Sequence, residues 1–102
     1  MSDVIITVRA EADLDRAILY NRRRSPRTVG RWVERLLAVV DSLSWNPERF
    51  AVSDLRGADG SEWRETLFGR RRGTGTYRIL YRVTPNAVFV TRIIRATVNR
   101  IA

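Results

Sequence analysis

The chain has 102 residues, a net charge of +8, no cysteine and no histidine. This length predicts a single domain spanning residues 1–102. The missing residue types exclude disulfides, thiolate metal sites and the commonest general base. No run approaches the roughly 20 apolar residues of a membrane span, and the N-terminus lacks the design of a signal peptide. We therefore expect a cytoplasmic protein that uses no metal, no cofactor and no membrane.

The charge is carried by arginine alone: all 19 basic residues are arginine, against 11 acidic residues. GC-rich coding explains the preference for arginine over lysine, but it does not explain the excess over the acids. Such an excess on a small domain favours a polyanionic partner, which is RNA, DNA or an acidic protein. A solvated basic surface without a partner is the alternative.

The first half of the chain predicts a strand followed by a helical hairpin. Val4–Val8 is a β-branched run. Apolar residues then recur at helical spacing over residues 10–23, with Thr7 or a neighbour as the cap. Ser25-Pro26 supplies an N-cap and a first-turn proline for a second helix, which runs to about Leu43. The short connection makes the two helices antiparallel.

The second half predicts a loop and three strands. Residues 46–61 contain proline and glycines and are typical of a loop. The strands are Glu62–Phe68, Tyr77–Val83 and Val88–Arg95, and a Thr-Pro-Asn-Ala turn joins the last two into a hairpin. The order is β-α-α-β-β-β. It predicts an α+β fold with the helical hairpin packed on one face of a small antiparallel-rich sheet.

Arginines gather on the predicted C-terminal strands. Strand alternation places Tyr77 and Tyr81 on one face and Arg78 and Arg82 on the other. On the last strand Arg92 and Arg95 are three positions apart, so in a regular strand their side chains point to opposite faces. The arginines that could converge on the free face and its rim are Arg64, Arg70, Arg71, Arg72, Arg78, Arg82 and one of Arg92 or Arg95. Arginine binds phosphate bidentately and keeps its charge, and exposed tyrosines stack on bases. These strands are therefore a candidate nucleic-acid interface.

Structural roles compete with this interpretation. At least one of Tyr77 and Tyr81 is expected in the core, because both alternate with aliphatic residues. Arg82 could protect an edge strand from aggregation, and the run Arg70–Arg72 could be solvated loop charge.

The tryptophans and carboxylates also have structural interpretations. Trp32 and Trp45 are expected in the core or in packing of the hairpin. Glu62 and Glu65 flank Trp63-Arg64, and one of them is expected to be the counter-ion of an arginine rather than an acid–base group.

Several fragments, taken in order, point to a known family. They are Ala10-Glu11-Ala12-Asp13-Leu14 with Tyr20, Ser25-Pro26, the stretch LSWNPER from Leu43 to Arg49, the stretch RETLFG from Arg64 to Gly69, YRILYRV from Tyr77 to Val83, and the apolar strand Val88 to Ile94. With the β-α-α-β-β-β order, this pattern resembles the RelE/ParE superfamily, the toxins of bacterial type II toxin–antitoxin pairs. The resemblance covers nearly the whole chain, and the Y-R-I-L-Y segment is its most telling piece.

The resemblance implies two activities. RelE-like members cleave mRNA in the ribosomal A site, and ParE-like members poison DNA gyrase without cutting RNA. Both are neutralised by a cognate antitoxin, which we expect to be acidic. The charge favours ribosome-dependent mRNA cleavage as the leading hypothesis. Gyrase inhibition and a degenerate, non-toxic relative are the alternatives.

The resemblance also implies catalytic positions. Arg78 corresponds best to the residue that holds the scissile phosphate, and Arg64 and Arg82 are weaker candidates. Many relatives end the last strand in a histidine, near the position of Arg92 or Arg95, and some have a tyrosine near the C-terminus. This chain has neither. Arginine cannot act as a general base near neutral pH. The resemblance therefore implies a phosphate-binding group, whereas the proton-transfer group is either missing or unrecognised.

Overall fold

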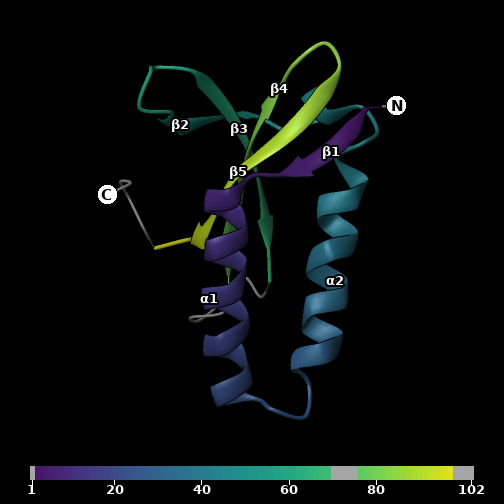
Figure 1. Ribbon diagram of the computed structural model, residues 1–102, viewed down its shortest axis with the longest axis vertical. Helices are drawn as coiled ribbons and strands as arrows, with labels where there is room; N and C mark the ends of the chain where they lie inside the picture. The colour runs from purple at the N-terminus through teal and green to yellow at the C-terminus, as the bar shows by residue number, and fades with distance from the viewer. Residues whose placement is uncertain (1, 70–75, 98–102) are drawn as a thin grey trace.

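A five-stranded mixed sheet packs against two helices in the computed structural model, which describes residues 2–69 and 76–97 (Figure 1). The elements are β1 (Asp3–Ile6), α1 (Val8–Arg24), α2 (Val29–Ser42), a 3-10 turn (Pro47–Arg49), β2 (Val52–Arg56), β3 (Glu62–Phe68), β4 (Tyr77–Val83) and β5 (Ala87–Arg95). The strands lie in the order β1-β5-β4-β3-β2. β1 is parallel to β5, and the other neighbours are antiparallel. No helix within residues 2–69 and 76–97 is long and apolar enough to cross a membrane.

The Thr7 cap of α1 agrees with the sequence prediction, although the helix begins at Val8, which was predicted to end the preceding strand. The Thr7 hydroxyl accepts a hydrogen bond from the Ala10 amide (3.2 Å), as an N-cap does. The same hydroxyl donates to the carbonyl of Val90 in β5 (2.8 Å). One threonine therefore both begins the helix and ties it to the last strand.

The start of α2 was predicted wrongly. Ser25-Pro26 was expected to begin the helix, but the helix begins at Val29, and Thr28 at its N-cap makes no side-chain capping bond. The amide of Ser25 instead donates to the Asn21 carbonyl and closes α1, while the Ser25 carbonyl accepts from the amides of Thr28 and Val29. Serine and proline favour a tight turn as much as a helix start, and here they form the connection.

A strand was missed in the segment predicted as a loop over residues 46–61. β2 pairs with β3 through Val52↔Arg64 and Arg56↔Glu62, with an irregularity between them. Only Ser53 and Leu55 of this short edge strand are buried. A buried serine beside an exposed valine gives no clear apolar alternation, so the periodicity that marks a strand is weak here.

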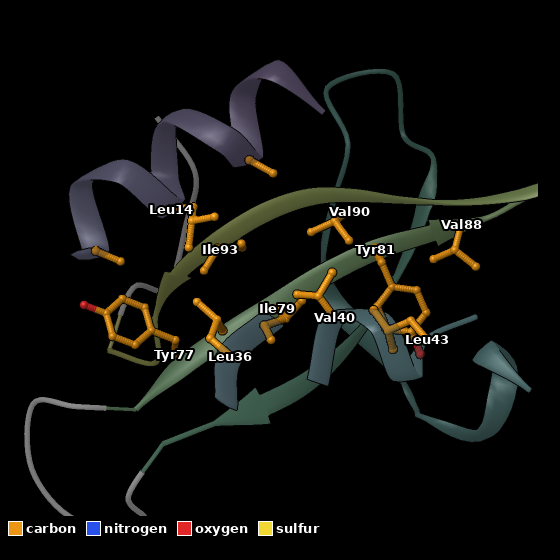
Figure 2. Packing of buried hydrophobic residues seen from close by; sticks show 12 residues of the cluster. Leu14, Leu36, Val40, Leu43, Tyr77, Ile79, Tyr81, Val88, Val90 and Ile93 are labelled. Atoms are coloured by element: carbon orange, nitrogen blue, oxygen red, sulfur yellow. The ribbon is translucent and has the colours of Figure 1, made fainter. Parts of the chain in front are cut away.

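The main core lies between the helices and one face of the sheet, as predicted (Figure 2). The alternation along β4 is confirmed: Ile79 and Tyr81 point into this core, whereas Leu80 belongs to a smaller cluster on the opposite face. The core residues labelled in Figure 2 are Leu14, Leu36, Val40, Leu43, Tyr77, Ile79, Tyr81, Val88, Val90 and Ile93. The smaller cluster consists of Leu55, Trp63, Leu80 and Ile94. Both faces of the sheet therefore carry packed apolar side chains.

The tryptophans of the hairpin behave differently from one another. Trp32 packs edge-on against Phe68 and Tyr77, with ring centroids 5.6 Å apart in each pair. Trp45, which was expected to pack as well, is 66% exposed. It follows the end of α2, where Arg49 lies over its ring and donates to its carbonyl oxygen. Trp45 therefore belongs to a surface cap at the end of the helix.

A buried ion pair joins α1 to β5. The Arg92 guanidinium donates through Nε to Asp13 Oδ2 (2.7 Å) and through Nη2 to Oδ1 (3.3 Å), and the Ile93 amide donates to Oδ2 (3.0 Å). Asp13 is 4% exposed and Arg92 8%. The fold tolerates this buried carboxylate because each of its two oxygens accepts at least one hydrogen bond.

An irregularity in β5 accompanies this ion pair. Leu80 pairs with Arg92 and Tyr81 with Val90, so Thr91 is an extra residue in β5. Such a bulge re-aims the side chains beside it. Arg92 reaches Asp13 and Arg95 lies over the ring of Tyr20, 4.7 Å from its centroid. Both arginines contact α1, although their spacing in a regular strand predicts opposite directions.

Removing one partner of the buried pair should destabilise the fold strongly. Asp13→Ala leaves the Arg92 charge buried without its carboxylate, and we expect the free energy of unfolding to fall by about 3–5 kcal/mol. Urea denaturation measures this change. Asp15→Ala, at an exposed position of the same helix, should change it by less than about 0.5 kcal/mol. The double replacement Asp13→Leu/Arg92→Met should lower the free energy of unfolding by less than Asp13→Ala does, because it leaves no unpaired charge. An equal or larger decrease would show that the unpaired charge of Arg92 is not what destabilises Asp13→Ala.

Candidate functional site

Arg78, the leading candidate from the sequence, lies in a network on the sheet face opposite the helices. Its Nε donates to Glu65 Oε2 (3.1 Å), and its Nη2 lies 2.5 Å from Glu65 Oε1. The same Nη2 is 2.5 Å from Asp54 Oδ1 and 3.1 Å from the hydroxyl of Ser53. The Ser53 hydroxyl in turn donates to Glu65 Oε1 (2.6 Å). Three adjacent strands, β2, β3 and β4, therefore supply one connected polar cluster.

Two carboxylates share the single arginine charge in this cluster. The hydrogen bonds that Arg78 donates to Glu65 raise the pKa of Arg78, and its hydrogen bond to Asp54 contributes further. The hydrogen bond from Arg78 lowers the pKa of Asp54, which makes that carboxylate a weaker base. The Arg78 side chain is only 10% exposed. A phosphate could take the place of these carboxylates only after two short ion pairs were broken, so the arrangement stabilises the sheet more than it prepares a phosphate site.

The other two catalytic candidates are not brought together with Arg78. Arg64 pairs opposite Tyr81, on the helix-facing side, and donates to the carbonyls of Glu48 (3.2 Å) and Phe50 (2.7 Å). It holds the segment that leads into β2. Arg82 is exposed and lies over the ring of Phe89. The three arginines therefore have separate surroundings and form no single constellation.

The tyrosines proposed for stacking are core residues. Tyr77 is 3% exposed and Tyr81 0%. The Tyr81 hydroxyl donates to the Pro47 carbonyl (2.5 Å), and burial raises the pKa of Tyr81 to about 12. Burial likewise raises the pKa of Tyr77, whose hydroxyl accepts from Asn21 Nδ2 (3.2 Å). Neither ring offers a face to a base, and neither hydroxyl is suited to lose a proton near neutral pH.

The remaining candidates for nucleic-acid binding have mixed positions. Arg92 is engaged by Asp13 and buried. Arg95 is half-buried over Tyr20, and its Nε is buried with no hydrogen-bond partner among the described residues. Arg70, Arg71 and Arg72 lie outside the described residues. Within residues 2–69 and 76–97, no group of three or more acidic side chains could hold a metal ion.

A group of exposed arginines lies instead at the closed end of the helical hairpin, while others, such as Arg9, Arg49 and Arg56, are spread over the rest of the described residues. The chain has six arginines and no acidic residue from Arg16 to Val33. Five of them flank the α1–α2 connection at the lower end of Figure 1, and all five are exposed. They are Arg22, Arg23, Arg24, Arg27 and Arg31, which we call the basic tip. The run is visible in the sequence, but Arg22–Arg24 had a sufficient explanation as cations at a helix C-terminus.

Comparison with known families identifies the chain. Residues 4–99 match the family described as ParE toxin of type II toxin-antitoxin system, parDE. The chain belongs to the ParE toxin family. No curated protein matches it. The match confirms the expected RelE/ParE superfamily and assigns the chain to the ParE branch, whose toxins pair with a cognate antitoxin.

The Asp54 carboxyl of this ParE-family toxin should report on the Arg78 network. We expect it to titrate below its ordinary pKa of 3.8 because of the hydrogen bond from Arg78. Arg78→Gln should raise that pKa toward 3.8. Since the folded-state pKa is depressed, the carboxylate stabilises the fold above pH 3.8, and this contribution is lost as the pH falls through the folded-state value. Carboxyl NMR titration measures both values.

Asp59 provides an internal control in the same spectra. Its pKa is also lowered, chiefly by hydrogen bonding with Ser61 rather than with Arg78. Arg78→Gln should therefore leave the Asp59 titration in place while it moves that of Asp54. A titration of Asp54 at or above 3.8 in the unmodified protein would show that the network does not form in solution.

Proposed function

We propose that this ParE-family toxin inhibits DNA gyrase by binding it, and that it does not cleave RNA. The proposal of gyrase inhibition is supported by the family match to ParE toxins, because the superfamily resemblance links that branch to gyrase. The observation that carries the argument against RNA cleavage is the engagement of Arg78 by Glu65 and Asp54.

RNA cleavage needs groups that the described part of the chain does not assemble. A 2′-hydroxyl must lose a proton, a crowded phosphate must be stabilised, and the leaving oxygen must gain a proton. The chain has no histidine, and Tyr77 and Tyr81 are buried with raised pKa values. Asp54 is made less basic by its arginine partner. Arg78, Tyr77 and Tyr81, which could share this chemistry, are therefore committed to the fold.

The net charge alone favours mRNA cleavage, because the ribosome and its message are polyanions. The exposed arginines at the basic tip, however, are on the helical hairpin and not on the sheet where Arg78 lies. Charge that lies away from the candidate catalytic strands supports binding and does not support a cleavage site. This observation favours a toxin that acts by binding its target.

The antitoxin partner follows from the same charge distribution. ParE toxins pair with a cognate antitoxin, and a toxin with a net charge of +8 favours an acidic one. We propose that the antitoxin is acidic and that its binding blocks toxicity. An on-rate that falls steeply with ionic strength is the kinetic consequence.

Two assays with the purified toxin separate the proposed function from mRNA cleavage. We expect inhibition of plasmid supercoiling by gyrase, and no effect on a coupled translation extract at the same toxin concentration. The physical reason is that inhibition requires a protein–protein contact, whereas cleavage requires an assembled acid–base site. Addition of the cognate antitoxin should restore supercoiling.

A variant distinguishes the two activities further. Arg82 is the one exposed residue among the three catalytic candidates Arg64, Arg78 and Arg82, so Arg82→Ala removes the most accessible phosphate ligand on these strands without opening the core. It should leave translation unaffected, as in the unmodified toxin. Fragmented mRNA and arrested translation that Arg82→Ala relieves would overturn the proposal in favour of cleavage.

A further inference from the structure

We propose that the basic tip of the helical hairpin binds the phosphate backbone of double-stranded DNA. This surface is distinct from the sheet arginines and lies where α1 ends and α2 begins (Figure 1). The proposal does not depend on which enzyme the toxin inhibits, because it concerns a contact that the isolated protein makes with nucleic acid.

The basic tip carries concentrated charge, and four of its five arginines have no carboxylate partner among the described residues. All five of its arginines are exposed. Among residues 2–69 and 76–97, no carboxylate forms an ion pair with Arg22, Arg23, Arg27 or Arg31. Arg24 contacts Tyr20, both through its hydroxyl (3.2 Å) and over its ring. By contrast, Arg78 and Arg92 on the sheet are paired with carboxylates.

Helix electrostatics explain only part of this cluster. Cations at a helix C-terminus interact favourably with its dipole, which accounts for Arg22–Arg24 at the end of α1. The same effect disfavours Arg27 and Arg31, which flank the start of α2, where the first turn has no acidic residue. Thr28 also makes no capping bond there. The local cost of placing these two arginines at a helix N-terminus indicates a role outside the fold, and an external anion would offset it.

The composition of the tip identifies the kind of anion. From residue 22 to residue 31 the only branched or aromatic apolar side chain is Val29, which is half-buried. Protein interfaces have apolar or aromatic anchors at their centre and few charges there. Single-stranded nucleic acid is held by stacking on aromatic rings. The tip offers neither, and its arginines fit the phosphates of a duplex, which are bound by charge and bidentate hydrogen bonds.

The test is fluorescence anisotropy of a 20-base-pair DNA duplex of arbitrary sequence, with the full chain freed of its antitoxin. We expect the logarithm of the association constant to fall linearly with the logarithm of the salt concentration. The slope should be about −4, since each phosphate contact contributes about −0.9. The pair Arg27→Gln/Arg31→Gln should weaken binding at least about tenfold at 50 mM salt and reduce the slope by about 2. The single strand of the same length should bind more weakly than the duplex.

The matched control removes the same charge from elsewhere. Arg9→Gln/Arg56→Gln also removes two exposed arginines, one at the opposite end of α1 and one in β2. It should change the affinity less than about threefold, because only long-range charge is lost. Circular dichroism on both variants verifies that they fold. Equal losses for the two pairs, equal binding of the single strand, or absence of DNA binding at 50 mM salt would each overturn the proposal. So would weakened antitoxin binding with unchanged DNA binding, which would make the tip a protein interface.

Discussion

The Asp13 carboxylate holds the N-terminal and C-terminal halves of the chain together. It lies on the first helix and accepts three hydrogen bonds from consecutive residues of the last strand, Arg92 and Ile93. Beside it, the Thr7 hydroxyl binds the Val90 carbonyl, and β1 runs parallel to β5 up to that residue. A parallel pair needs a crossover connection, and here the chain from β1 to β5 supplies it through both helices and the strands β2, β3 and β4. The position of both helices over the sheet therefore depends on contacts between residues about 80 positions apart.

The same physical constraint decides which arginines remain available for binding. An arginine can be buried only with acceptors for its donors. Helix α1 provides them for Arg92 through Asp13, the neighbouring strands provide them for Arg78 through Glu65 and Asp54, and the segment before β2 provides backbone carbonyls for Arg64. These three side chains are committed to the fold. Among the described residues, Arg22, Arg23, Arg27 and Arg31 at the closed end of the hairpin have no carboxylate partner, and they stay exposed. A chain with a net charge of +8 thus becomes a domain in which some arginines are held by the fold and others are exposed.

Much of the fold follows from local pattern. The predicted bounds of β3 and β4 agree with the structure, because Glu62–Phe68 and Tyr77–Val83 are flanked by breaks and rich in strand-forming residues. The Thr7 cap and the counter-ion role of Glu65 were also predictable from residue type and spacing. The start of α2 and the strand β2 were not, because Ser25-Pro26 suits a turn as well as a helix, and because Ser53 occupies a buried position on an edge strand. The exposure of Trp45 was not predictable from residue type either. Its size favours burial, but its place after α2 leaves it exposed.

The sequence by itself determined the order of the elements apart from β2, the two faces of β4 and membership of the superfamily, since these depend on periodicity and on motifs that are local in the chain. It also determined the absence of histidine, which limits the chemistry open to the site. Only the tertiary structure decided that Arg78 and Arg92 are neutralised and that the tyrosines are enclosed, because their partners lie far along the chain or on the opposing helices. Burial and ion pairing are properties of such long-range neighbours, and no local pattern of arginines can distinguish a charge held by the fold from one offered to a partner.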